Sequence, residues 1–99
     1  MYNAEKFIRN CPMLRDGGVV RRLEQERLLP LEFGGTEIVR LARWKKCSSS
    51  ERRCIEFALS LYDPSHFKCN VGQFLMAVSD HETLVFAADW LIKGPSALD

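Results

Sequence analysis

Apolar residues recur at helical spacing along most of the chain and predict five or six short amphipathic helices. The expected helices span residues 4–10, 19–28, 36–46, 49–62, 71–78 and 80–93. Apolar residues alternate near Leu29–Phe33, which allows one short extended element there. The pattern therefore predicts an all-α bundle in which residues 1–99 form a single helical domain.

Polar residues next to these apolar stretches predict where several helices begin. Ser48 and Glu51 have the spacing of a capping box in front of helix 49–62. Ser79 and Glu82 repeat this spacing in front of the last helix, and Asn70 is the expected cap of helix 71–78.

Proline and glycine predict where helices end. Cys11-Pro12 should end the first helix, because a residue before proline disfavours the helical conformation. Asp16-Gly17-Gly18 is typical of a turn, and Asp63-Pro64 should stop helix 49–62. Gly94-Pro95 should end the last helix in the same way.

The last helix is apolar in nearly every direction, and Asp89 is the one polar gap between Leu84 and Ile92. A helix of this kind needs to be surrounded. It is either the central helix of the bundle or a helix whose free face meets another subunit or a partner. In the second case, Phe86 and Trp90 are the candidate oligomer interface.

The composition is that of a globular protein, with 46% hydrophobic and 27% charged residues. The longest uninterrupted apolar stretch, Leu84–Ala88, is far shorter than a membrane-spanning helix requires, and the first residues lack the apolar core of a secretory signal. We expect a cytoplasmic protein that does not enter the membrane. Its four cysteines are then expected to be reduced thiols.

The net charge of +1 conceals two oppositely charged halves. Residues 1–53 hold twelve Lys and Arg against seven Asp and Glu, a net charge of +5. Residues 54–99 hold two against six, a net charge of −4. Such halves allow head-to-tail self-association, although the same charges can equally pair within one monomer.

The residues that begin a zinc-protease motif do not complete it. His81 and Glu82 match its start, but the second histidine would have to occupy the position of Val85. Without two imidazoles one helical turn apart, there is no metal ion for Glu82 to serve. Neither Gly-Gly pair matches a phosphate-binding loop. We expect no catalytic residues and no cofactor.

Cys47, Cys54, His66 and Cys69 are the residues that could form a zinc site. Structural zinc sites usually use two closely spaced pairs, and only the pair His66 and Cys69 is close here. Cys54 also falls within an apolar helical face, where a free cysteine behaves as a small hydrophobic residue. We therefore expect no metal. Cys47 lies beside two lysines and in front of a helix, a setting that can lower a thiol pKa.

The most informative surface feature is residues 40–53, called the basic segment below, which hold six cations, one anion and a tryptophan. The candidate partner-binding residues are Arg40, Arg43, Trp44, Lys45, Lys46, Arg52 and Arg53. A charge run of this kind can be no more than a solvated helix face. Because Arg and Trp are enriched at binding hot spots, the functional hypothesis is a protein-binding module that docks on an acidic partner surface.

Nucleic-acid binding through the same segment is the alternative, with the cations on phosphates and Trp44 stacked on a base. Two features disfavour it. A dedicated nucleic-acid binder is usually basic overall, whereas this chain is nearly neutral. The helix that would read DNA begins with Asp80-His81-Glu82, whose carboxylates would repel phosphates.

Residues 44–62 combine Trp44, a serine-rich cap with Glu51, and an Ala-x-x-Leu helix at 58–61. In this they resemble small uncharacterised bacterial proteins carried by phages and mobile elements. The resemblance covers about twenty residues and implies no known activity. It implies an accessory or regulatory protein, such as an inhibitor that occupies the surface of a host protein.

Overall fold

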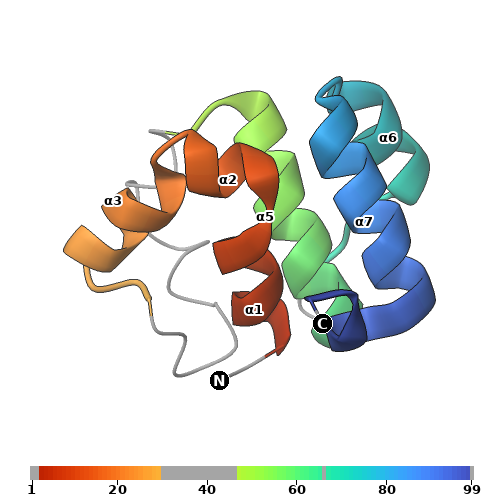
Figure 1. The fold of residues 1–99 in the computed structure, drawn as a ribbon, viewed down its shortest axis with the longest axis horizontal. Coiled ribbons are helices and arrows are strands. Elements are labelled where there is room, and N and C mark those ends of the chain that lie inside the picture. The colour runs from red at the N-terminus through yellow and green to blue at the C-terminus, as the bar shows by residue number, and fades with distance from the viewer. Residues whose placement is uncertain (1–2, 30–46, 66, 99) are drawn as a thin grey trace.

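The computed structural model describes residues 3–29, 47–65 and 67–98, which form helices joined by short turns (Figure 1). In chain order the elements are α1 (Asn3–Asn10), α2 (Pro12–Asp16), α3 (Val19–Gln25), α5 (Ser49–Tyr62), α6 (Val71–Ala77), α7 (His81–Lys93) and the 3₁₀ helix η2 (Gly94–Leu98). These ranges contain no strand, and the predicted all-α class is confirmed. The helix expected over 36–46 lies outside the described residues. Of the possible extended element Leu29–Phe33, only Leu29 is described, and it has no regular secondary structure.

α5 begins and ends where the sequence predicts. Its N-cap, Ser48, accepts a hydrogen bond from the Glu51 backbone N–H, and the Glu51 carboxylate accepts one from the Ser48 backbone N–H, at 3.1 and 2.8 Å. This reciprocal pair satisfies two backbone donors that the helix itself cannot satisfy. Asp63 follows the last turn, in front of Pro64.

α2 is the helix that the sequence analysis missed. Cys11-Pro12 does end α1, as expected, but Pro12 is also the first residue of the five-residue α2. Proline suits this position, because the first backbone nitrogen of a helix has no partner within the helix and the fixed φ of proline is already helical. Gly18, with a φ of 77°, is the N-cap of α3. This helix ends at Gln25, whereas the sequence predicted that it would continue to Leu28.

The N-cap of α7 is Asp80, so the predicted capping box of Ser79 and Glu82 is wrong. Asp80 accepts hydrogen bonds from both the backbone N–H and the hydroxyl of Thr83, at 3.1 and 2.6 Å. The buried Thr83 hydroxyl in turn accepts a hydrogen bond of 3.1 Å from the Met13 backbone N–H. This chain of polar contacts ties the start of α7 to α2.

The core lies around α5. α1, α2 and α6 pack against α5, α2 also packs against α7, and η2 folds back onto α7 and α1 (Figure 1). The fully buried large side chains come from six different helices and from Val78, which directly follows α6. They are Phe7, Ile8, Leu14, Ile55, Phe57, Leu59, Phe74 and Trp90, together with Glu5, Val19 and Val78.

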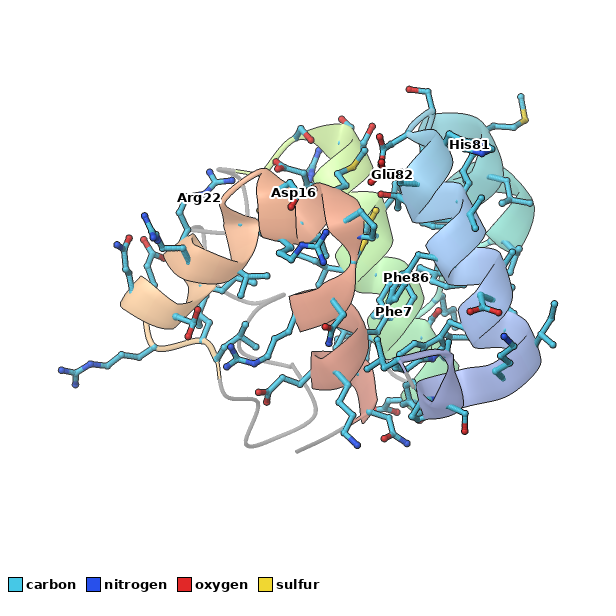
Figure 2. All side chains as sticks on the ribbon, in the orientation of Figure 1. Phe7, Asp16, Arg22, His81, Glu82 and Phe86 are labelled. Atoms are coloured by element: carbon cyan, nitrogen blue, oxygen red, sulfur yellow. The ribbon has the colours of Figure 1, made fainter. Side chains whose placement is uncertain are left out.

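Phe7 is the centre of an aromatic cluster that joins three helices. Its ring lies 5.6 Å from Phe57 of α5, and 5.0 and 5.3 Å from Phe86 and Trp90 of α7, between ring centroids. Figure 2 shows Phe7 and Phe86 side by side between α1 and α7. The buried Trp90 indole donates its N–H to the Tyr62 hydroxyl at 2.8 Å, so its polar atom is satisfied.

α7 lies at the surface and is not surrounded. Thr83, Ala87 and Trp90 form its buried face, while Val85 and Ile92 are 54% and 81% exposed. Although α7 has apolar residues on nearly all sides, only those on one side pack into the core. None of the described helices is long and apolar enough to cross a membrane.

Replacing Phe7 with alanine should lower the free energy of unfolding by about 3–5 kcal/mol, because it leaves a cavity that three aromatic rings line. Val85→Ala is the matched control, since Val85 is an apolar residue of α7 with a largely exposed side chain, and should cost about 0.5 kcal/mol. Urea unfolding followed by circular dichroism measures both values. Equal losses in the two variants would show that the cluster does not hold the helices together.

Candidate interaction surface

The structure describes only part of the predicted partner-binding set. Arg40, Arg43, Trp44, Lys45 and Lys46 lie outside the described residues. Arg52 and Arg53 lie in the first turns of α5, at the end of the basic segment. The part of the candidate surface that the structure describes is therefore the N-terminal half of α5 with its neighbouring residues.

Several contacts fix the position of this end of α5. Besides the capping box, the Ser50 hydroxyl donates to the Ala77 carbonyl of α6 at 3.0 Å. On the other side, Gly17 lies against the Glu51 carboxylate, and a Cβ at this position would be 3.0 Å from Glu51 Oε2 and 2.7 Å from the Met13 carbonyl oxygen. Glycine thus allows the turn between α2 and α3 to pack against α5. The two arginines are held on a well-anchored helix.

A polar hollow of about 180 Å³ lies along the solvent-facing side of α5. Among the described residues, Ser49, Arg52, Arg53 and Glu56 line it, and we call it the α5 hollow. Their spacing of three, four and seven residues places all four side chains on one face of the helix. The hollow offers one hydroxyl, two guanidinium groups and one carboxylate.

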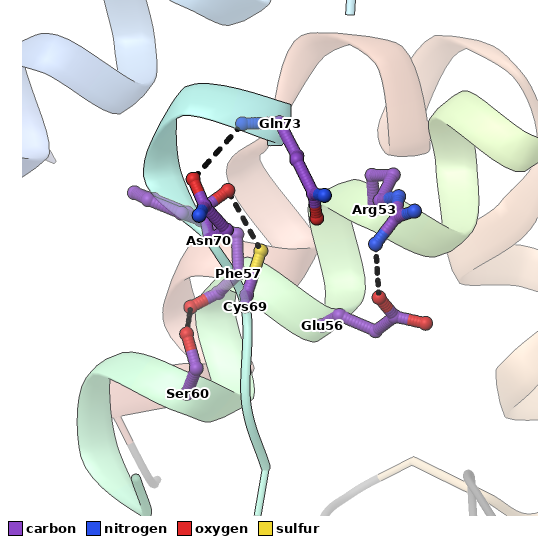
Figure 3. Close-up of polar contacts among 7 residues, drawn as sticks. All are labelled: Arg53, Glu56, Phe57, Ser60, Cys69, Asn70 and Gln73. Atoms are coloured by element: carbon purple, nitrogen blue, oxygen red, sulfur yellow. Dashed lines mark hydrogen bonds and ion pairs between the residues drawn. The ribbon is translucent and has the colours of Figure 1, made fainter. Parts of the chain in front are cut away.

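Arg53 is only loosely paired. Arg53 Nη1 lies 3.5 Å from Glu56 Oε2 (Figure 3). Arg22 of α3 points its Nη2 towards Glu51 Oε1 at 3.7 Å. The Arg53–Glu56 pair, whose side chains are 40% and 32% exposed, contributes little free energy, so the Arg53 guanidinium group can exchange this carboxylate for that of a partner.

Arg52 carries the most unusual polar atom of the surface. Its Nε is the one buried side-chain nitrogen or oxygen in the described residues that has no hydrogen-bond partner. Leaving a buried donor unsatisfied costs free energy. The Arg52 side chain also lines the α5 hollow.

The partly buried thiols near this surface are not activated. Burial raises the pKa of the Cys47 thiol, and the nearby Glu51 carboxylate raises it further. The expected lowering at Cys47 is therefore not found, because these effects outweigh those of Arg22 and Arg52. Burial also raises the pKa of Cys69, whose thiol donates to the Asn70 carbonyl at 3.9 Å (Figure 3).

The possible zinc ligands are not brought together in the part of the chain that the structure describes. There, no three His, Cys, Asp or Glu side chains are close enough to hold a metal ion. Cys54 is fully buried in the core, Cys47 and Cys69 are partly exposed, and His66 lies outside the described residues. That the chain holds no metal stays a prediction.

The two aromatic residues proposed for an oligomer interface lie within the monomer. Trp90 is 2% exposed, and Phe86 packs against both Phe7 and Trp90. The Trp90 ring is therefore part of the core, whereas Phe86 is partly buried and its place in an oligomer interface stays a prediction. The exposed apolar residues of α6 and α7 are instead Val71, Leu75, Met76, Val85, Leu91 and Ile92.

Sequence reasoning found the two arginines but missed the hollow. Ser49 and Glu56 are not among the residues that the sequence singled out. The signal that could have united them is the spacing of Ser49, Arg52, Arg53 and Glu56, which is the spacing of one helical face.

No family model matches the chain, and comparisons with curated proteins and with solved structures find no significant match. The resemblance of residues 44–62 to phage and mobile-element proteins stays a prediction.

Removing the Ser48 hydroxyl should loosen the start of α5. Ser48→Ala is expected to lower the free energy of unfolding by about 1 kcal/mol, because the Glu51 backbone N–H loses its acceptor. Ser49→Ala, at the next position, removes a hydroxyl with no capping role and should leave stability within about 0.5 kcal/mol of the wild type. Thermal unfolding measures the stability of both variants. A larger loss of stability in Ser49→Ala than in Ser48→Ala would contradict this account.

Proposed function

We propose that the chain is a non-catalytic interaction protein that docks the basic segment and the α5 hollow on an acidic surface of a partner protein. The observation that carries this proposal is the buried, unpartnered Nε of Arg52 beside a second, loosely paired arginine. An arginine on a helix face that is merely solvated would expose its Nε to water. The Nε of Arg52 is instead buried without a partner.

Carboxylates are the chemistry that the α5 hollow fits best. A guanidinium group offers several N–H donors in a fixed plane and binds a carboxylate through two parallel hydrogen bonds. Arg52 and Arg53 lie side by side in the sequence, and the Ser49 hydroxyl adds a further donor. An aspartate or glutamate of the partner would displace Glu56 from Arg53 and pair with the Arg52 guanidinium group.

The remainder of the basic segment, which directly precedes α5 in the sequence, has a composition that suits the same partner. Arg40, Arg43, Lys45 and Lys46 add positive charge, and Trp44 adds a large aromatic side chain of the kind found at the centre of interfaces. Complementary charge mainly speeds association and selects partners, whereas a buried aromatic group slows dissociation. The segment contains both.

A non-catalytic role is supported by the chemistry of the described residues. His81 and Glu82 begin α7 and lie exposed at its end, and Val85 stands one turn further along where a metal site would need a second histidine (Figure 2). The partly exposed thiols have raised pKa values and are poor nucleophiles at neutral pH.

Following the resemblance of residues 44–62, we further propose that the chain is a phage or mobile-element protein that inhibits or regulates a host protein. A small domain does so by occupying a surface that the host protein needs for another partner. An acidic host surface, such as one that itself binds a basic protein, would be matched by the positive charge of the basic segment.

The proposal predicts that a tagged chain captures a specific protein from a bacterial extract and that this capture needs the α5 hollow. Changing Arg52 and Arg53 together to alanine should weaken the isolated complex about tenfold or more, which corresponds to about 1.4 kcal/mol. Titration of the purified partner, followed by calorimetry, measures the change. An Arg43/Trp44/Lys46 triple alanine variant should weaken it as well.

The matched control changes two exposed arginines elsewhere, Arg15 of α2 and Arg21 of α3, to alanine and removes the same charge. It should bind as the wild type does. Equal losses in the Arg52/Arg53 and Arg15/Arg21 variants would mean that only net charge matters, and unchanged binding in the former would refute the role of the hollow.

Nucleic-acid binding through the same cations remains the alternative function, and salt separates the two. Binding of a short DNA or RNA duplex that releases counterions should weaken steeply as salt is raised. We expect no such binding, because the acidic Asp80 and Glu82 at the start of α7 oppose it. Recovery of nuclease-sensitive material with the tagged chain, in place of a protein, would favour the alternative.

Self-association through the oppositely charged halves should be weak and sensitive to salt. Sedimentation velocity at low and high salt is expected to show dimers or larger species at low salt only. A species that persists at high salt would instead indicate contact through the exposed apolar residues of α6 and α7, and Met76→Glu, at a residue 90% exposed, should then disperse it. A monomer under both conditions would contradict self-association.

A further inference from the structure

The outward face of α7 is apolar. Thr83, Ala87 and Trp90 face the core, whereas Val85 and Ile92 lie on the opposite side of the helix and are largely exposed. A helix at the surface of a globular protein normally turns polar residues towards the solvent. An apolar face that stays exposed along a helix marks a surface that another molecule covers.

The exposed residues of this face have the spacing of a coiled-coil seam. His81, Val85, Ala88 and Ile92 are separated by four, three and four residues, and all four are exposed. Side chains at this spacing form one stripe along a helix and fit between the side chains of a second helix. The small side chain of Ala88, near the middle of the stripe, allows the axis of that helix to come close. We call these four residues the α7 seam.

The charged residues of α7 stand on one edge of the seam. Glu82 and Asp89 are seven residues apart, so their carboxylates lie on the same side of the helix. Lys93 is the only lysine or arginine of α7, and its Nζ pairs with Asp89 Oδ1 at 3.1 Å. The two side chains of this pair are well exposed, so it contributes little free energy and Asp89 can exchange it for another cation. The edge carries two carboxylates and one ammonium group, and its net charge is negative.

We propose that the α7 seam docks an amphipathic helix of a partner protein, one whose apolar stripe is bordered by lysines or arginines. The apolar stripe of that helix would bury Val85 and Ile92, and its cations would pair with Glu82 and Asp89. Charged residues that border the seam between two helices select the partner in this way.

The charge of the edge disfavours two other occupants. A second copy of α7 offers no complementary cation, because Lys93 already pairs with Asp89 within the helix. A helix that lies on a membrane carries Lys and Arg beside its apolar face, since the headgroups that it meets are often anionic. Glu82 and Asp89 would be repelled by such headgroups. A basic helix satisfies both the apolar face and its charged edge.

This surface is separate from the α5 hollow. It lies on a different helix and attracts the opposite charge, so the inference does not depend on the proposed function. The Arg52/Arg53 double alanine variant, which should lose the acidic partner, should bind a basic helix as the wild type does. Failure of one surface is thereby distinguishable from failure of the other.

The probe is a synthetic, fluorescently labelled helix of about three heptads, with isoleucine and leucine at the seam positions and lysine at the bordering positions. Repulsion between the lysines keeps this peptide from pairing with itself. A second peptide carries glutamate in place of every lysine. Titration with the folded chain, followed by fluorescence anisotropy, measures both affinities. We expect the lysine peptide to bind about tenfold more tightly or better, and to shift the NMR amide signals of α7 but not those of α3.

Two variants separate the apolar contact from the charge. Ile92→Glu should weaken binding of the lysine peptide about tenfold or more, although the added carboxylate attracts lysine. Because Ile92 is largely exposed, this variant should keep its fold, which circular dichroism verifies. Gln25→Glu adds the same charge at an exposed residue of α3 and is the matched control, which should bind as the wild type does. Glu82→Lys/Asp89→Lys should reverse the preference, so that the glutamate peptide binds more tightly.

Several results would overturn the proposal. These are equal binding of the two peptides, no binding of either, or undiminished binding of the lysine peptide by Ile92→Glu. Dimers of the chain that Ile92→Glu disperses, in the absence of peptide binding, would assign the seam to a second copy instead. Binding to anionic lipid vesicles in place of the lysine peptide would assign it to a membrane surface.

Discussion

Five consecutive or nearly consecutive residues of α5 lose almost all contact with solvent, because α1, α2 and α6 pack over them. These residues are Cys54, Ile55, Phe57, Ala58 and Leu59. Burial of this face fixes the rotation of α5 about its own axis, so the opposite face must carry whatever residues stand at 49, 52, 53 and 56. The α5 hollow is thus a consequence of the core. Substitutions at these four positions can change the chemistry of the hollow without changing the packing of the buried face.

The same burial places the Cys54 thiol 3.9 Å from the Met13 sulfur, and the Phe57 ring against Phe7 and Phe74. The polar and the apolar contacts of α5 therefore stabilise one arrangement. Its first turn is held by the capping box and by Ser50, and its last turn by the hydrogen bond from Trp90 to Tyr62. Because α5 is anchored along its whole length, we expect the backbone that carries its arginines to keep its position when a partner binds.

Local signals predicted much of this fold. Ser48 with Glu51, Asn70 and Gly94 mark helix boundaries through short-range hydrogen bonds and backbone preferences, and the structure bears them out. The failures are cases in which one residue serves two purposes. Pro12 ends one helix and begins the next, and Asp80 competes with Ser79 as a cap and prevails because Thr83 offers it both a backbone and a hydroxyl donor.

What the sequence could not predict depends on which elements meet in space. Periodicity marked α7 as apolar on every side, but only the position of Phe7 decides that Phe86 and Trp90 face the core. Met13 and Cys54 are far apart in the chain, so their contact has no local signal. The sequence identifies Arg52 as a candidate binding residue. That its Nε is buried without a partner depends on the packing around it, which the sequence does not reveal.

The central claim is that α5 is a rigid support whose first turns are as stable as its buried centre. Native-state hydrogen exchange measures this directly, residue by residue. The account predicts that the amides of Arg52 and Arg53, the former bonded to the Ser48 carbonyl at 2.9 Å, exchange with free energies close to those of Ile55 and Leu59. Rapid exchange at Arg52 and Arg53, with protection confined to the centre of α5, would contradict it.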